Sequence, residues 1–482
     1  MNPHTILRVI GLLLCFLALA MTPALIVAIA HGDGGVRAFV TSIIITAFAG
    51  ALTYLLAREE GEWQLSHRDG VTIVAVGWAA AGFFGALPFW FDGSFHSFTD
   101  AYFESLSGFT TTGASVLTEI EGVHKGTLLW RSIIQWLGGM GIIVLSIAIL
   151  PFLRVGGMQL YKAEVPSPVV DKLKPRIAET ASILWKIYVA FTVLEIVLLL
   201  LGGMSLYDAV CHSFCTLPTG GFSPKNASVG YYNSTYIDIV IAVFMMLAGI
   251  NFSLHYRLFK GNRKIFLLDT ECRFFLIITG VFILIVTLDI YGSVYKGIGE
   301  ALRYASFQVS SIITTTGFAT ADYEKWPALS QSILLTCMFI GASAGSTGGG
   351  IKCMRLWLLI KHSYNELIRT IHPHAVMRIK LGGNPVPDEV IHSVWGFFIL
   401  YMGLFLIASL IMMALGTDMT TSFASVAATM GNIGPGLGMV GPADNYALIH
   451  PAGKWVLSMC MLLGRLEIYT VMVMLLPEFW RS

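Results

Sequence analysis

A short phrase rich in threonine and glycine recurs four times along the 482 residues of the chain. The copies are TTTGAS from Thr110, PTGGFS from Pro218, TTTGFA from Thr314 and GNIGPG from Gly431. Backbone carbonyls can replace the hydration shell of a cation, and glycine adopts the dihedrals that turn successive carbonyls toward one axis. No Asp or Glu lies inside the phrases, which disfavours a site for divalent cations. The repeat therefore predicts four loops that together line a cation pore with carbonyl oxygens.

Each phrase contributes three residues to this predicted selectivity filter. Aligned on a shared glycine, the residues are Thr111, Thr112, Gly113, Thr219, Gly220, Gly221, Thr315, Thr316, Gly317, Asn432, Ile433 and Gly434. The shared glycines are 108, 96 and 117 residues apart, too far for a solenoid repeat. Threonine hydroxyls can either coordinate the ion or brace the loop. The fourth phrase lacks the T-x-G or T-G-G core of the others, so its geometry is the hardest to predict.

The composition indicates which elements must hold these loops. Hydrophobic residues make up 55% of the chain and charged residues 12%, and the mean hydropathy is +0.73. Such a composition is typical of a membrane protein, and the net charge of +1 gives no indication of a nucleic-acid partner. A spanning helix needs about 20 apolar residues. Ten segments qualify: 6–30, 38–57, 71–91, 129–153, 181–203, 234–257, 273–292, 329–361, 390–415 and 452–477.

A short apolar run precedes each glycine loop, at 100–109, 208–217, 304–313 and 421–430. Ten residues give roughly 15 Å of helix, about half the thickness of a bilayer. These runs are expected to be re-entrant pore helices. The alternative is that they are extracellular loop helices, but an ordinary loop has no reason to repeat its phrase at one offset.

The predicted fold is an all-α polytopic membrane protein with four M1–pore helix–M2 repeats around a pseudo-fourfold pore. Two extra helices precede the repeats. The expected division is 1–69 for the extra helices, then 70–179, 180–268, 269–388 and 389–482 for the repeats. Basic residues concentrate in the connections 154–176, 257–273 and 352–380. By the positive-inside rule these connections and both termini are cytoplasmic, and the glycine loops lie toward the outside.

Further motifs accompany the four phrases: GGMGIIVL (138–145), GGMQLY (156–161), PRIAET (175–180), GSTGGGIK (345–352) and GRLEIY (464–469). Together they resemble the membrane subunit of the Trk-type bacterial potassium uptake family, TrkH/TrkG branch, over essentially the whole chain. The resemblance implies K⁺ as the transported ion, no organic cofactor, and a place in the bacterial inner membrane. It also implies a homodimer and a cytosolic, nucleotide-binding regulatory partner of the TrkA type. Gly113 fits the potassium-permeable members, whereas serine there would indicate sodium.

The predicted span 329–361 is interrupted by GASAGSTGGG, residues 341–350. Non-helical backbone at membrane depth survives only when it is buried in protein or lines a wet cavity. By its position in the third repeat, the stretch should lie on the cytoplasmic side of the filter and obstruct ion flow. It is therefore expected to form a gate, with flexible residues Gly341, Gly345, Gly348, Gly349 and Gly350. The alternative is a glycine patch for close helix packing.

Arg465 is predicted near the middle of the last span, where a charge is costly unless it faces protein or water. One interpretation is an electrostatic barrier on the ion path, which the resemblance supports. The alternative is a structural ion pair with Glu104 or Glu195. His372 and His374 lie two residues apart in a basic connection, where a solvated docking surface is favoured over metal binding.

Two other classes of protein compete with a channel-like pore. Gly341-Ala342-Ser343-Ala344-Gly345 matches the G-x-S-x-G pattern of a serine hydrolase, but it lacks the strand–turn–helix context. The chain is therefore not expected to be an enzyme. A potassium/proton or sodium-coupled secondary transporter with broken helices is the second alternative, but such folds usually show twofold repeats.

Overall fold

The computed structural model describes residues 3–57, 66–148, 177–374, 377–382 and 384–481. Within these residues the fold is all-α, as predicted, apart from one pair of two-residue strands. Six segments are long and apolar enough to cross a membrane. They are Pro3–His31 (α1 Pro3–Ala20 and α2 Thr22–His31), α3 Val36–Leu56, Arg68–Phe91 (in α4 His67–Gly85 and α5 Leu87–Phe91), Ala181–Leu201 (in α9 Ile177–Leu201), α14 Thr270–Ile290 and α18 Asp388–Ala414.

The other predicted spans differ from a straight helix. Helix α7 (Lys125–Ala148) covers the described part of 129–153, and residues 149–153 lie outside the described residues, as do the motif 156–161 and the basic connection 154–176. The span 329–361 is broken as predicted, into α16 (Ala328–Phe339) and α17 (Cys353–Ile371).

Two predicted spans are wrong as single helices. Segment 234–257 is α11 (Thr235–Gly249) and α12 (Phe252–Phe259), bent by 100°. Segment 452–477 is α20 (Pro451–Arg465) followed by α21 (Tyr469–Met472) and η5 (Val473–Leu475), bent by 111°. At the second bend Glu467 and Ile468 have φ of 58° and 43°. Hydropathy measures apolarity over a window and cannot detect a local change of backbone dihedrals.

Four short helices form at the predicted runs: α6 (Phe98–Phe109), α10 (Leu206–Thr216), α15 (Ile298–Ile313) and α19 (Met419–Met430). Helix α15 is longer than predicted, because it begins at Ile298 and not at residue 304. The other three begin at a side chain that accepts a hydrogen bond from the backbone N–H three residues on. These N-caps are Ser97, Ser205 and Asp418. Such caps satisfy donors that the first helical turn leaves unpaired, and they fix where each helix begins.

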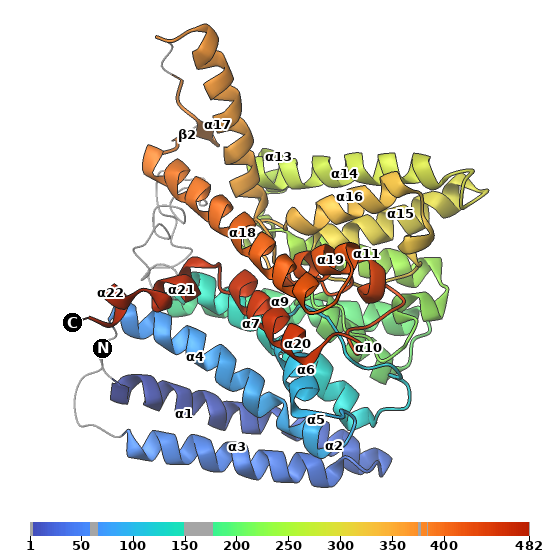
Figure 1. Cartoon of the computed structure of the whole chain (residues 1–482). Coiled ribbons are helices and arrows are strands. Elements are labelled where there is room, and N and C mark those ends of the chain that lie inside the picture. The colour runs from blue at the N-terminus through green and yellow to red at the C-terminus, as the bar shows by residue number, and fades with distance from the viewer. Residues whose placement is uncertain (1–2, 58–65, 149–176, 375–376, 383, 482) are drawn as a thin grey trace.

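The remaining elements are short. They are η2 Ser228–Tyr232, α13 Ile265–Leu268, η3 Tyr323–Lys325, β1 Lys380–Leu381, β2 Asn384–Pro385, η4 Gly438–Val440 and α22 Pro477–Trp480. Figure 1 shows α1, α3 and α4 on one side of the molecule and α14 to α16 on the opposite side, with α7, α9 and α20 between them. Helix α17 projects from the body, and the N and C ends lie on the same side.

Candidate functional site

Each of the four short helices ends in the same hydrogen-bonded turn. A backbone N–H donates to the carbonyl five residues earlier, at 2.8 Å in all four cases: Thr112 to Ser107, Gly220 to Cys215, Thr316 to Ser311 and Ile433 to Ala428. This is the six-to-one bond of a Schellman motif, which satisfies helix carbonyls that would otherwise be unpaired. Because a helix carries partial negative charge at its C-terminus, all four loops begin at an end that favours a cation.

The loop backbones also repeat one unusual conformation. A left-handed residue is followed two positions later by a left-handed glycine. The φ values are 52° and 80° for Thr111 and Gly113, 57° and 78° for Thr219 and Gly221, 63° and 83° for Thr315 and Gly317, and 55° and 97° for Asn432 and Gly434. For a residue other than glycine this conformation costs about 1–2 kcal/mol. The fourth loop therefore adopts the backbone of the other three although its sequence departs from theirs.

The shared glycines bring the four loops together in a closed ring. A Cβ added to any of them would lie closer than 3.0 Å to a carbonyl oxygen of the following loop. Gly113 meets the carbonyl of Gly220, Gly221 that of Thr316, Gly317 that of Ile433, and Gly434 that of Thr112. Each loop thus contacts the next in chain order, and the fourth contacts the first. The twelve predicted filter residues are all in this ring.

The threonine hydroxyls of the ring are mostly engaged in bracing. Thr112 Oγ1 bonds to Thr110 Oγ1 at 2.7 Å, and Thr316 Oγ1 bonds to Thr314 Oγ1 at 2.8 Å. In contrast, the buried Thr111 Oγ1 has no hydrogen-bond partner among the described residues. Within the same part of the chain, the carbonyl oxygens of Thr112, Thr316 and Ile433 accept no hydrogen bond. Carbonyl oxygens are therefore the groups left available to a ligand.

Polar side chains outside the phrases also hold the loops, and the sequence did not indicate them. Gln135 of α7 donates to the carbonyl of Gly220 at 2.6 Å and accepts from the N–H of Phe222 at 3.1 Å. Tyr323, after the third loop, donates its hydroxyl to the carbonyl of Gly436 at 2.9 Å. These residues lie far from the phrases they hold, so no local pattern indicates them.

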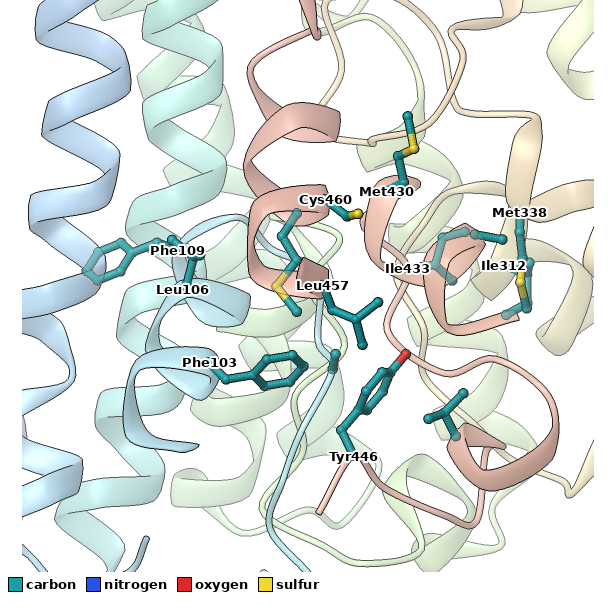
Figure 2. Close-up of a cluster of buried hydrophobic side chains, with 14 of the residues drawn as sticks. Phe103, Leu106, Phe109, Ile312, Met338, Met430, Ile433, Tyr446, Leu457 and Cys460 are labelled. Carbon is teal, nitrogen blue, oxygen red and sulfur yellow. The ribbon is translucent and has the colours of Figure 1, made fainter. Parts of the chain in front are cut away.

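The junction of the fourth and first loops has its own connections. Asn432 Nδ2 donates to Thr112 Oγ1 at 2.9 Å and to the carbonyl of Met461 at 3.0 Å. Tyr446 donates its hydroxyl to the carbonyl of Gly434 at 2.6 Å, and its N–H donates to the carbonyl of Ser115 at 2.8 Å. Figure 2 shows the Tyr446 ring beside Phe103 and Leu457, with its oxygen directed toward the fourth loop. Asn432, which stands where the other phrases have threonine, thus bonds the fourth loop to the first.

The glycine run 341–350 lies against the loop entrances, at the ends of the short helices. A β-bridge between Ile340 and Ile351 joins the two ends of the run, and we call these ends its neck. The Gly349 N–H donates to Thr315 Oγ1 at 2.7 Å, and the Thr347 hydroxyl donates to the carbonyl of Leu217 at 2.8 Å. A Cβ on Gly348 would meet the carbonyl of Thr314, and one on Gly349 that of Gly431. Of the predicted gate glycines, Gly348 and Gly349 contact the ring, while Gly341 and Gly350 form the neck and Gly345 packs against Asn251.

Charged side chains from other elements hold this run. Glu271 of α14 accepts the N–H groups of Ala344 at 2.8 Å and Met354 at 3.1 Å. Lys352 donates to the carbonyl of Gly348. Arg465 Nη1 donates to the carbonyl of Thr347 at 2.8 Å. Sequence reasoning identified Arg465 but missed Glu271, which lies about 70 residues from the run it contacts.

The structure corrects two expectations for Arg465. It is the last residue of α20, at the bend, and not in the middle of one continuous helix. It is 3% exposed, and no carboxylate among the described residues lies within ion-pair distance of it. Glu104 instead pairs with Arg131, and the buried Glu195 carboxylate has no hydrogen-bond partner in the described part of the chain. The ion-pair alternative with Glu104 or Glu195 is therefore wrong.

The hydrolase alternative also finds no support in the geometry. Ser343 is 1% exposed, and its Oγ has no hydrogen-bond partner, histidine included, among the residues that the structure describes. Those residues also contain no group of three potential metal-ligating side chains around His372 and His374 or elsewhere.

The fold and the site define an all-α polytopic membrane protein in which four glycine-containing loops meet in a ring. The chain belongs to the TrkH family of cation transport proteins, which matches residues 35–481. This is a transport family and not a family of enzymes, as the sequence predicted.

Relatives cover the full chain. It is 45% identical to the Trk system potassium uptake protein TrkH of Salmonella typhimurium, with 100% of both chains covered. It is 36% identical to the Trk system potassium uptake protein TrkG of Escherichia coli K12, over 98% of this chain and 97% of that protein. The crystal structure of the potassium transporter TrkH from Vibrio parahaemolyticus superposes with a TM-score of 0.92 at 41% identity, again over 100% of both chains. The resemblance inferred from the motifs is confirmed.

Proposed function

We propose that the chain mediates potassium uptake through a channel-like pore in which the ring of four loops is the selectivity filter. The observation that carries the proposal is the closure of the ring, because each shared glycine packs against a carbonyl of the next loop. Carbonyl oxygens that accept no protein hydrogen bond can replace the water around K⁺. The four helix C-termini at the loop entrances add a favourable potential without a fixed charge. Curated relatives named as potassium uptake proteins support the choice of ion.

The glycine run 341–350 and Arg465 are the proposed gate. The run contacts the entrances of the second, third and fourth loops, so it obstructs the path of an ion that leaves the filter on that side. Arg465 places a positive charge on the same run. Opening then requires the run to move away from the ring. The proposed repeats are 70–179, 180–268, 269–388 and 389–482, after the extra helices in 1–69.

The proposed setting is the bacterial inner membrane, with both termini in the cytoplasm. The positions of the N and C ends on one side of the molecule support a common side for the termini. A homodimer and a cytosolic nucleotide-binding partner of the TrkA type are proposed from the family, since relatives are named as members of a Trk system. Helix α17 projects from the body and offers a surface for such a partner.

The test is potassium flux into liposomes that contain the purified protein, with and without competing sodium. The wild type is expected to favour K⁺, and Gly221→Ser is expected to lose this preference because its Cβ strikes the third loop. Gly280→Ser on α14 is the matched control, since nothing lies within 4 Å of its Cβ. Uptake that requires a proton or sodium gradient would instead support a coupled transporter. Equal preference in wild type and Gly221→Ser would overturn the filter assignment.

A further inference from the structure

One position recurs behind the loops, nine residues before each shared glycine. It is occupied by Glu104, His212, Gln308 and Ser425, all 0% exposed. Three of them bond to the segment that follows the glycine of their own loop. Glu104 accepts from Ser115 Oγ and the Val116 N–H, both at 2.9 Å, His212 Nε2 bonds to Ser223 Oγ at 3.1 Å, and Gln308 Nε2 donates to the carbonyl of Ala321 at 3.2 Å. Ser425 bonds within its own helix, to the carbonyl of Ser422.

The first three of these residues, Glu104, His212 and Gln308, act as struts between the short helix and the far side of its loop. A strut fixes the distance between two points of the backbone because shortening or lengthening it breaks a buried hydrogen bond, which costs free energy. Glu104 is the one carboxylate of the four, and it carries a full negative charge when ionised. A buried carboxylate requires a cation and a full set of hydrogen bonds.

Arg131 of α7 supplies the cation. It is 2% exposed, and its Nε donates to Glu104 Oε1 at 2.8 Å. Its Nη2 lies 2.7 Å from the same carboxylate oxygen and donates to Ser115 Oγ at 3.2 Å. The first loop and its strut are thus held by two of the three guanidinium nitrogens.

The third nitrogen of Arg131 reaches the second loop. Its Nη1 donates to the carbonyl of Ser223 at 3.3 Å, and the guanidinium carbon lies 4.1 Å from the centre of the Phe222 ring. Ser223 is also the partner of the second strut, His212. One planar group therefore links the struts of two adjacent loops, at the junction where Gly113 packs against Gly220.

We propose that Glu104 and Arg131 are positioning residues that determine ion preference, because together they fix the spacing of the first and second loops. The inference rests on the proposed function of the ring as a filter. Neither side chain contacts the ion. They act through the carbonyls of the two loops, whose separation sets how well each ion size is coordinated.

Arg131→Lys is the decisive variant. Lysine keeps the charge and satisfies Glu104, but a single ammonium cannot reproduce the planar fork that spans three acceptors. In liposomes, the ratio of K⁺ to Na⁺ flux is expected to fall by about tenfold, equivalent to ~1.4 kcal/mol of discrimination. The maximal K⁺ rate and the melting temperature should change little.

Arg303→Lys is the matched control. Arg303 of α15 pairs with Asp238 of α11 at 2.8 Å, but neither residue bonds to a loop of the ring in the described structure. Its K⁺/Na⁺ flux ratio should match the wild type. A loss of ratio in both variants would mean that any broken ion pair disturbs the filter, and it would overturn the specific role of Arg131.

A double variant covers the case in which Arg131→Lys does not fold. Glu104→Gln with Arg131→Met removes both charges, so no buried charge is left unpaired. A folded double variant with an unchanged flux ratio overturns the inference, and one with a lowered ratio and an unchanged melting temperature supports it. Absence of potassium preference in the wild type would instead contradict the proposed function itself, so the two failures are distinguishable.

Discussion

The chain contains two kinds of buried non-helical backbone, the ring of four loops and the glycine run 341–350, and they are held in different ways. In the ring, backbone N–H groups of each loop bond to the preceding helix, and the next loop fills the space beside each glycine. In the run, side chains of other elements supply much of the support, among them Glu271 and Arg465.

The difference indicates which region can move. Displacing one loop of the ring requires a helix end to unwind and an adjacent loop to shift, so the four loops are interlocked. The hydrogen bonds between the run and the loops pass through the hydroxyls of Thr315 and Thr347, so they can break while the backbone bonds of the ring remain intact. Moving the whole run also requires breaking backbone bonds to α11 and α12, such as the one from the Ser343 N–H to the carbonyl of Gly249 at 3.0 Å. The comparison predicts that substitutions in the ring alter ion preference, whereas substitutions around the run alter the amount of flux.

The largest effect is expected for Gly317→Ala. One methyl group must fit where the carbonyl of Ile433 lies, in a left-handed residue with φ of 83°. The dihedral costs about 1–2 kcal/mol and the overpacking about 1–3 kcal/mol, so the K⁺/Na⁺ flux ratio should collapse. Gly280→Ala is the control in flux and in thermal unfolding. Retention of the full ratio in a folded Gly317→Ala protein would contradict an interlocked ring.

The next effect is expected for Glu271→Ala, which removes the acceptor for two N–H groups around the run. Hydrogen bonds to a charged group contribute about 1.5–3 kcal/mol each, so basal K⁺ flux should rise at least tenfold with the K⁺/Na⁺ ratio unchanged. Glu271→Gln, which keeps an acceptor oxygen, should lie between wild type and Glu271→Ala. Glu366→Ala on α17, an exposed glutamate paired with Arg369, controls for the loss of charge. Unchanged basal flux would indicate that the run is a packing element.

A smaller effect is expected for Arg465→Gln. At an effective dielectric near 20, two like charges separated by roughly 8 Å repel by ~2 kcal/mol, which sets the order of magnitude of what neutralisation can contribute to the rate. Maximal K⁺ flux should therefore rise several-fold, and the ion ratio should stay constant. Because no carboxylate pairs with Arg465 in the described residues, the melting temperature of the variant should equal that of the wild type. A lower melting temperature without a gain in flux would contradict the barrier.

The smallest effect is expected for Asn432→Ala, which keeps the backbone of the fourth loop and removes its bonds to Thr112 and Met461. Thermal unfolding should show a loss of about 1–3 kcal/mol, the usual range for two neutral hydrogen bonds. The K⁺/Na⁺ ratio should fall slightly, since Tyr446 still joins the fourth loop to the first. A fall as large as that of Gly317→Ala would mean that side chains, and not the backbone, hold the ring.

The sequence predicted the elements around the site better than the contacts within it. Three of the short helices begin close to the predicted runs because capping residues mark their starts locally. Helix α15 has no side-chain cap and begins at Ile298, before its predicted run 304–313. The shared glycines were identifiable because the same steric demand recurs four times. The break at 341–350 was predicted because glycines without helix formers cannot continue a helix.

Long-range partners were not predictable from one sequence. Glu104 and Arg131 are 27 residues apart, and Arg355 and Glu467, which also pair, are 112 apart. Their meeting depends on how helices pack, and no periodicity encodes it. The bends after Gly249 and Arg465 were missed for a related reason, since in each case the two bent helices together are still apolar enough, averaged over a window, to pass as one span.

The four left-handed positions of the ring that are not glycine already differ, three being threonine and the fourth Asn432. In an assembly of four identical subunits, one mutation in the gene would change the pore at four places at once. Here the loops belong to one chain, so a mutation changes a single quarter and leaves three unchanged. Asparagine adopts the left-handed conformation more readily than most residues, which makes the fourth quarter the least strained. Mutations can therefore change the residues of one loop at a time. Among relatives, substitutions in the ring should accumulate separately in each loop and not in matched sets of four.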